Sequence, residues 1–305
     1  VLAASSLKAM ATSSFSFKRV GVSMVLIKSL SKPTIEVVWL NKRLCQNIAH
    51  ATVFTMKSII RLLVVAILFS SSVVKADSLN KATMYYGVHY YSYIERTTEY
   101  DPFMELKSQI PTFTLGLRDE SAIRSENSTN KFSYFAEGSL GRVNYTQHTG
   151  AGSHAHNYWV IQTEGVYALP FNFYAGLGYR HLKDYLSQAG LGGYDRQNQL
   201  VYLPVGYTIK NPNDSSIKLQ YNILIEGTQF SQLSQIPGYG DLTNVQNEGY
   251  GLDLSYVLPG GTMEIFGKYW NIEDSTTNTS SGTKWIISGL EPLNETFELG
   301  VKFVF

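Results

Sequence analysis

Hydrophobic and polar residues alternate with a period of two over much of the chain after residue 77. The clearest stretch, residues 217–226, has large apolar side chains at its odd positions and mostly polar side chains at its even positions, which are Lys218, Gln220, Asn222, Leu224 and Glu226. Successive side chains of an extended chain point to opposite faces, so this pattern predicts a strand with one apolar and one polar face. Its length suits a tilted strand that crosses a bilayer, which needs roughly 9 to 11 residues.

Similar segments recur along the chain, with turn or loop residues between them. We count ten, at about 83–95, 110–119, 132–145, 158–168, 171–182, 200–209, 217–226, 250–258, 263–272 and 297–305. The first two alternate less cleanly, so totals of eight or twelve strands stay open. The pattern predicts an all-β fold, a closed antiparallel transmembrane barrel of about ten strands. Pro204 falls within the sixth segment, where we expect a bulge or kink because proline cannot donate to the ladder.

Short and long connections alternate between these segments. Residues 169–170, 210–214 and 258–261 are short connections, whereas the stretches near 146–157, 183–199, 227–248 and 273–294 are long and polar. Transmembrane barrels have short turns on one rim and long loops on the other. With an even strand count, both ends of the barrel chain lie on the short-turn, periplasmic rim, and the long loops face outside. One connection, residues 120–130, is long for the periplasmic rim.

The final segment, residues 297–305, has Phe297, Leu299, Val301, Phe303 and Phe305 on one face and ends on an aromatic residue. This ending resembles the closing strand of bacterial outer-membrane β-barrels, of the small OmpA/OmpX-like or omptin-sized kind. The resemblance implies that Phe303 and Phe305 form part of the signal that the barrel assembly machinery reads. It also implies a location in the cell outer membrane of a Gram-negative bacterium, contact with outer-membrane lipid, and a monomer.

The front of the chain carries a pattern of a different kind. Residues 56–76 combine a short basic head, an apolar run at residues 62–69 and a small-residue exit, which predicts a signal peptide cleaved after Ala76. Residues 77–305 are then the barrel, and residues 1–55 a disordered, non-native upstream extension. That extension holds Cys45, the chain's single cysteine, so the mature barrel would contain no disulfide or thiolate metal site.

Composition narrows the class of partners. The formal net charge of +1 gives no reason to expect nucleic acid, which requires a concentrated basic face. The 21 tyrosines, 15 phenylalanines and 25 glycines suit aromatic girdles at two membrane interfaces and crowded sheet positions. A tyrosine-rich soluble sandwich is the competing interpretation.

The inward-facing positions carry acidic and basic residues in near balance. This predicted lumen charge network comprises Arg118, Glu137, Glu164, Arg180, Lys218, Glu226, Asp253, Glu264, Lys268, Glu298 and Lys302, with His89 nearby. Charges withdrawn from water are tolerated when they are paired, so we expect cross-strand ion pairs. Side chains fill barrels of about eight strands, whereas open pores need about 16, so a lumen of about ten strands should be largely filled.

Candidate chemistry is sparse. His148, His154 and His156 lie close together and could ligate a metal, but structural sites usually need a fourth ligand and supporting hydrogen bonds, so we predict no metal and no cofactor. Omptin proteases resemble the chain in strand number and use an Asp-His pair at the outer rim, where His181 lies near Asp184 in sequence. Lipid A deacylases carry a His-x-Ser-Asn element, and Lys183 stands here where serine should be.

These observations favour a non-enzymatic role. We expect surface contact, adhesion or an envelope structural role through the long extracellular loops, with an unknown extracellular ligand. A narrow, porin-like channel for small solutes is the alternative interpretation. An outer-membrane enzyme, omptin-like or deacylase-like, comes third.

Overall fold

The computed structural model describes residues 22–28, 35–41, 82–97, 99–124, 131–148, 153–189 and 193–305. The chain divides into two compact units, Val1–Val73 and Val74–Phe305. In the first unit, β1 (Val22–Lys28) pairs with β2 (Ile35–Asn41) as an antiparallel ribbon. The predicted signal peptide, residues 56–76, and the rest of the predicted upstream extension lie outside the described residues.

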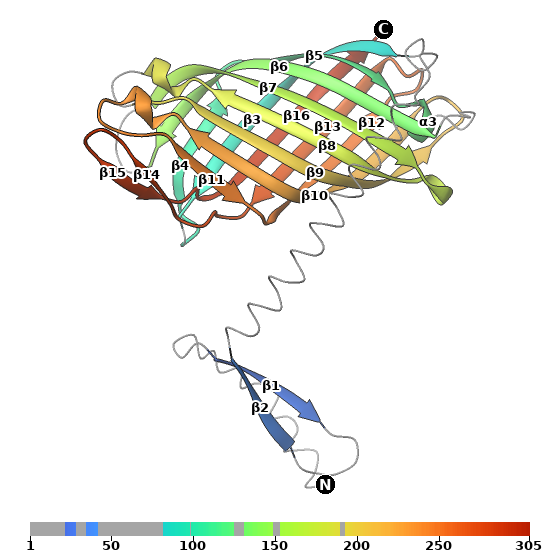
Figure 1. Ribbon diagram of the computed structural model, residues 1–305. Helices are drawn as coiled ribbons and strands as arrows, with labels where there is room; N and C mark the ends of the chain where they lie inside the picture. Colours follow the sequence, from blue (N-terminus) through green and yellow to red (C-terminus); the bar gives the residue numbers. More distant parts are fainter. Residues whose placement is uncertain are drawn as a thin grey trace, which may run out of the picture. The chain divides into compact units, whose positions relative to one another are not determined.

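The second unit is a closed antiparallel β-barrel of ten strands (Figure 1). In chain order its strands are β3 (Thr83–Arg96), β4 (Pro102–Ser108), β5 (Thr112–Asp119), β6 (Phe132–Gln147), β7 (Ser153–Ala168), β8 (Phe173–Asp184), β9 (Arg196–Lys210), β10 (Ser216–Ser231), β11 (Leu242–Gln246), β12 (Gly249–Val257), β13 (Met263–Ile272) and β16 (Leu293–Val304). Pairing of the last strand, β16, with the first, β3, closes the barrel.

Two of the ten crossings are each built from two strands. β4 and β5 pair with successive parts of β3 on one side and of β6 on the other. β11 and β12 likewise pair with successive parts of β10. The predicted all-β fold, the closed barrel and the strand count are therefore confirmed.

Several crossings extend further toward the long-loop rim than the alternation predicts. The second crossing begins at Pro102 rather than near residue 110, and β7 and β9 begin at Ser153 and Arg196. These extensions are rich in polar residues on both faces. A strand that continues beyond the lipid has no need of an apolar outer face, so the two-residue alternation fades there.

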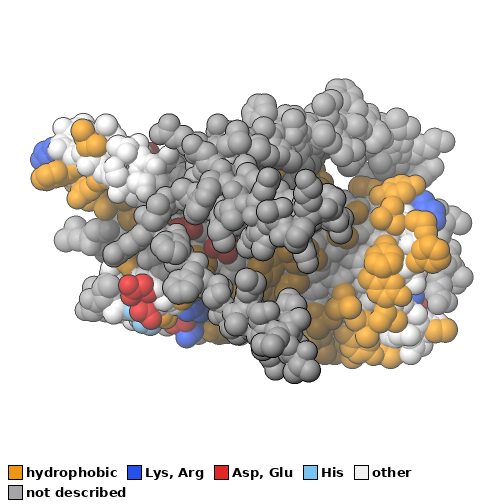
Figure 2. Space-filling view, turned by 90° about the horizontal axis from the view of Figure 1, so that it is seen from below, with side chains coloured by type: hydrophobic (Ala, Val, Ile, Leu, Met, Phe, Trp, Pro, Cys, Tyr) orange, Lys and Arg blue, Asp and Glu red, His pale blue; other side chains and the backbone are white. Residues whose placement is uncertain are grey.

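Apolar side chains cover the outer face of the barrel. Exposed large residues recur on strand after strand, such as Leu115 on β5, Leu219 on β10 and Leu299 on β16. Figure 2 shows hydrophobic side chains gathered over the described part of one face. Among the residues that the structure describes, no helix is long and apolar enough to span a bilayer.

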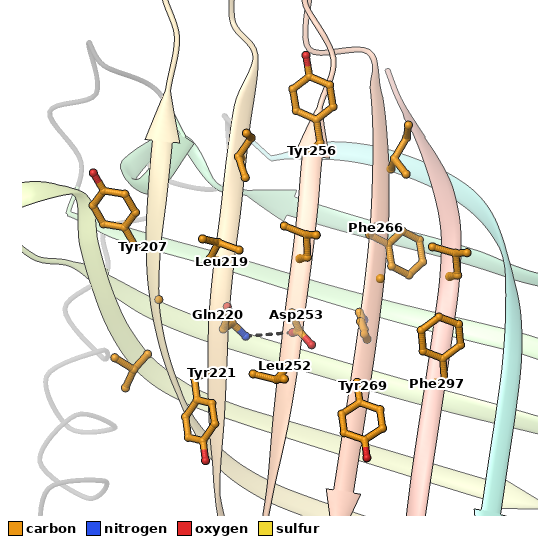
Figure 3. A pocket seen from close by; sticks show the side chains of 18 of the residues that line it. Tyr207, Leu219, Gln220, Tyr221, Leu252, Asp253, Tyr256, Phe266, Tyr269 and Phe297 are labelled. Carbon is orange, nitrogen blue, oxygen red and sulfur yellow. Dashed lines mark hydrogen bonds between the residues drawn. The ribbon is translucent and has the colours of Figure 1, made fainter.

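Tyrosines lie within this apolar belt and direct their hydroxyls two ways. A groove of about 930 Å³ runs over the outer face of β9, β10, β12, β13 and β16, and Figure 3 shows the side chains that line it. The hydroxyls of Tyr207 and Tyr256 point in one direction and those of Tyr221 and Tyr269 in the other, with Leu219 among the residues between them. Tyrosine prefers an interface where its ring is in an apolar layer and its hydroxyl is wet. The two sets of hydroxyls are therefore directed toward opposite ends of the strands (Figure 3).

The structure corrects two sequence predictions on β9 and β10. The register of β10 against β9 shifts between Leu224 and Glu226, so that Glu226 lies opposite Val201 on the outer face rather than in the lumen. Pro204 pairs with Asn222 of β10 without a register shift, so no bulge lies there, but the ladder with β8 is interrupted beside it, between the Ala175–Val205 and Gly178–Tyr202 pairs. A bulge adds one residue to one strand and thereby inverts the faces beyond it, which an uninterrupted alternation cannot anticipate.

The two ends of the barrel carry different elements. Helix α3 (Ser121–Arg124) lies at the short-turn end, whereas the hairpin of β14 (Asn278–Ser281) and β15 (Ile286–Gly289) lies at the long-loop end (Figure 1). Short 3₁₀ segments at Pro170–Asn172, Leu186–Ala189 and Leu233–Gln235 lie in three of the described connections.

Candidate functional site

The middle of the lumen is occupied by ion pairs between opposite walls. The carboxylate of Glu137 on β6 accepts hydrogen bonds from Lys268 Nζ on β13 at 2.6 Å and from Lys302 Nζ on β16 at 2.6 Å. Tyr85 on β3 donates its hydroxyl to the same carboxylate at 2.8 Å. All four side chains are buried. The arrangement satisfies each charge with a charged partner, which is the condition for burying charges at tolerable cost.

A second set of contacts lies beside the first. Arg180 of β8 donates to Glu298 of β16 at 3.0 Å, across the barrel. Gln220 of β10 donates to Glu164 of β7 at 2.9 Å and lies 3.2 Å from Asp253 of β12. The Arg180–Glu298 and Gln220–Glu164 bonds join strands that are not neighbours in the wall, so these lumen side chains brace the barrel from within.

Helix α3 closes the short-turn end. Glu120, just before the helix, pairs with Arg118 at 3.0 Å, Arg124 at 2.8 Å and Lys218 at 3.0 Å. Arg118 and Arg124 both pair in turn with Glu264 of β13. Burial alone would raise the pKa of the Glu120 carboxyl, but Arg124, Lys218 and Arg118 together hold that pKa well below its ordinary value.

Sequence reasoning missed Glu120 and Arg124 because neither lies in an alternating segment. The available signal was the length of the connection 120–130, which is too long for a tight turn. The structure shows why, since its first residues turn inward and bury Ala122 and Ile123. Ile123 packs in a cluster with Val166 and Tyr174 of the barrel wall.

A second ionic cluster closes the long-loop end. Arg196 of β9 donates to Glu95 of β3 at 2.5 Å and to Asp184 of β8 at 2.9 Å. Glu291, from the loop before β16, is buried beside this cluster, and its carboxylate lies 3.3 Å from the Tyr93 hydroxyl. Burial and the neighbouring Glu95 carboxylate raise the pKa of Glu291 well above its ordinary value.

The loop that carries Glu291 is tied down by its backbone. The Glu291 N–H donates to Ser275 Oγ at 2.8 Å, and the Ser275 N–H donates to the Glu291 carbonyl at 2.9 Å. Residues 275 and 291 flank the β14–β15 hairpin in sequence. The base of the hairpin is therefore fixed over the mouth of the barrel.

The three clustered histidines do not come together. His148 and His154 are exposed, whereas His156 is buried in the lumen with its Nε2 3.8 Å from Asp184 Oδ1. Within the described residues, no group of three or more His, Cys, Asp or Glu side chains is placed to hold a metal ion. His181 lies on the outer face, where its ring is 4.9 Å from that of Trp159, so it does not pair with the inward Asp184.

The predicted assembly residues lie on the outer face at the short-turn end. Phe303 stacks on Tyr86 of β3 with ring centroids 5.3 Å apart, and the Phe305 ring lies 5.8 Å from the same tyrosine. The terminal aromatics thus pack across the seam that closes the barrel.

Two cavities lie among the described side chains of the lumen, and both are small. The one beside Arg196 and the one beside Lys218 measure about 10 and 30 Å³. A cavity needs roughly 10 to 15 Å³ to hold one water molecule. Neither cavity could accommodate a solute much larger than water.

A closed wall of ten strands, an apolar outer belt and an ionic interior define the class of this protein. Its architecture is that of an outer-membrane β-barrel.

Comparisons with solved structures return barrels of the same class. The beta domain of the Bordetella autotransporter BrkA is 10% identical, with 73% of this chain and 100% of that chain covered and a TM-score of 0.42. The translocator domain of the autotransporter NalP from Neisseria meningitidis is 11% identical, with 80% and 97% covered and a TM-score of 0.34. An outer-membrane channel from Pseudomonas putida is 12% identical, with 73% and 96% covered and a TM-score of 0.32. No protein-family model and no curated protein matches the chain.

Proposed function

We propose that this protein is a non-enzymatic barrel of the outer membrane that presents its long loops for surface contact. The observation that carries the proposal is the filled lumen. Ionic clusters occupy both of its ends, and the cavities of about 10 and 30 Å³ beside them are too small for solutes. A barrel that passes no solute can still act as a rigid anchor for what projects from its rim.

The β14–β15 hairpin is the part of the rim best suited to contact. Trp285 and Ile286 are 56% and 76% exposed at its turn, although both side chains are large and apolar. The hairpin is fixed against the loop after β10, because the Lys284 and Trp285 N–H groups donate to the Gly238 carbonyl at 3.0 and 3.1 Å. Exposed aromatic residues on a rigid support are typical anchors of protein interfaces.

Conductance in planar bilayers tests the filled lumen. The full chain, purified and reconstituted, should give no single-channel steps. Stable steps in the unmodified protein would overturn the proposal and favour the channel interpretation.

Binding to whole cells or to surface components tests the contact role. A double variant with Trp285→Ser and Ile286→Ser should lose binding, because it removes the apolar contact area without touching the barrel wall. Thr277→Ala, an exposed change in the same loop, is the matched control and should bind as the original does. Equal binding by the double variant and the control would exclude this hairpin as the contact surface.

A narrow channel is the second candidate. It is favoured by the seal at the short-turn end, which α3 makes from a connection rather than from the barrel wall. Displacement of α3 would uncover the lumen at that end. If Arg124→Ala, which removes the pairs to Glu120 and Glu264, produces conductance that the original protein lacks, α3 is a plug.

A further inference from the structure

A pocket of about 290 Å³ lies at the long-loop rim, apart from the lumen and from the β14–β15 turn. Three chain segments form it: the end of β3 with the turn after it and the start of β4, the residues that follow β13, and the residues that lead into β16. Its lining comprises Arg96, Thr97, Tyr100, Phe103, Glu273, Asp274, Leu290, Pro292 and Leu293. The volume is close to the lower bound of small-molecule sites, about 300 Å³, and an apolar lining with few polar groups is typical of such sites.

The apolar part of the pocket is held in place by backbone bonds. The turn that carries Tyr100 is closed by hydrogen bonds from Thr97 N to Asp101 O at 2.8 Å and from Tyr100 N to Thr97 O at 2.9 Å. Tyr100 adopts a φ of 66°, and its side chain is 67% exposed. The Phe103 carbonyl accepts from His148 N at 3.1 Å, which ties the start of β4 to the end of β6. Backbone hydrogen bonds therefore anchor both aromatic residues at the pocket.

The charges of the pocket do not cancel. Arg96 is the cation in the lining, and Glu295 neutralises it through a salt bridge of 2.6 Å. Arg96 also donates to the Tyr100 carbonyl at 3.1 Å, so its guanidinium is committed to holding the turn. Among the described residues, the carboxylates of Glu273 and Asp274 form no ion pair. The pocket thus carries negative charge that no described side chain balances.

We infer that this pocket binds a small organic cation whose charged group is attached to an apolar body. The carboxylates of Glu273 and Asp274 attract the charge, and the aromatic rings of Tyr100 and Phe103 in the lining favour a cation over a neutral group through cation–π attraction. Leu290 and Pro292 offer apolar surface for the body of the ligand. An anion of the same size is excluded by the carboxylates, and a bare inorganic cation leaves the apolar surface uncovered.

This site adds a ligand class to the proposed surface role. It rests on that proposed function in one respect, which is that the long-loop rim and its pocket face the outside of the cell. Binding to the purified barrel does not depend on that orientation or on conductance. If the barrel shows no conductance and does not bind the cation, this inference alone is contradicted. If the barrel conducts and binds the cation, the proposed function alone is contradicted.

The test is calorimetric titration of the purified full chain, in detergent micelles, with phenethylammonium chloride. Its neutral counterpart, 2-phenylethanol, has the same body without the charge, and tetramethylammonium has the charge without the body. We expect phenethylammonium to bind and the other two to bind at least about fivefold more weakly. Equal affinity for phenethylammonium and 2-phenylethanol would overturn the inference.

Variants locate the binding. Asp274→Asn and Glu273→Gln should each lower the affinity for phenethylammonium roughly two- to fivefold, and the double variant should lower it about tenfold. The affinity for 2-phenylethanol should change little. Tyr100→Gly removes the ring, and glycine tolerates the positive φ of this position. The variant should lower the affinity for phenethylammonium roughly two- to fivefold, as expected for an exposed cation–π contact. Thr277→Ala is the control and should leave affinity unchanged. Undiminished binding by the double variant would refute the site.

A lysine-bearing peptide distinguishes a free cation from the side chain of a protein partner. If the protein binds phenethylammonium more tightly than a flexible Gly-Lys-Phe-Gly peptide, the pocket is a small-molecule site. Peptide binding without phenethylammonium binding would overturn the assignment of a small organic cation.

Discussion

Replacing Glu137 by glutamine tests whether the lumen is as dry as its packing indicates. The change keeps the shape of the side chain but removes the charge that two buried lysines share, with Lys268 and Lys302 each 2.6 Å from its carboxylate. Removing one partner from a buried ion pair costs about 3 to 5 kcal/mol, because the remaining charge is left uncompensated. Here two ammonium groups lose a common partner, so we expect a loss at the upper end of that range.

Urea unfolding of the barrel in lipid vesicles or micelles, followed by tyrosine and tryptophan fluorescence, measures this loss. Glu226→Gln is the matched control, since Glu226 carries the same chemistry on the outer face beyond the bulge. A surface change of this kind should alter the free energy of unfolding by no more than about 0.5 kcal/mol. If Glu137→Gln costs no more than Glu226→Gln, the lysines are solvated and the lumen is wet, which would refute the reasoning.

The remaining predictions concern the mouth of the barrel and the packing of its wall. The raised pKa of Glu291 means that its contact with the mouth is fully stable below the pKa of an unfolded glutamate, about 4.3, and is lost as the pH rises through the folded value. Amide exchange in residues 273–292 should therefore quicken with rising pH beyond its intrinsic trend, and Glu291→Gln should remove that excess; an unchanged excess in the variant would contradict the assignment. Gly178→Ala should destabilise the barrel by roughly 1 to 3 kcal/mol in the same urea assay, because the new methyl would lie 2.1 Å from the buried Tyr202 ring. Gly138→Ala meets nothing within 4 Å and should be neutral or stabilising, so equal costs for the two glycines would count against the packing described.

The part of the fold that sequence predicts well is the part in contact with lipid. On β13, the predicted bounds of Met263 and Ile272 are those observed, and the predicted inward residues Glu264 and Trp270 are buried. Lipid imposes an apolar residue at every second position, and that constraint is visible in any single strand. The alternation therefore predicts the order of the strands along the chain, the residues of the outer face and most of the residues of the lumen.

What sequence could not predict depends on contacts between distant segments. The bulge that moves Glu226 to the outer face is fixed by pairing with β9, not by the local alternation. Glu120 and Glu291 lie in connections, where no periodicity indicates which residues turn inward. The pair of His156 and Asp184 arises because adjacent strands bring them within 3.8 Å, although 27 other residues separate them in the sequence. Such sites follow from register and loop path, which a single sequence does not specify.

The most direct test of the central claim is a nitroxide scan along β10. Single cysteines are placed in turn at positions 217–224 and 226–229, with Cys45 replaced by serine, and each spin label is measured in lipid vesicles for its accessibility to oxygen. The structure predicts high accessibility at Ile217, Leu219, Tyr221 and Ile223, low accessibility at the residues between them, and an inverted phase beyond Leu224, with position 226 accessible and position 227 not. A scan without alternation, or one in which Lys218, Gln220 and Asn222 face the lipid, would contradict a barrel that is apolar outside and ionic within.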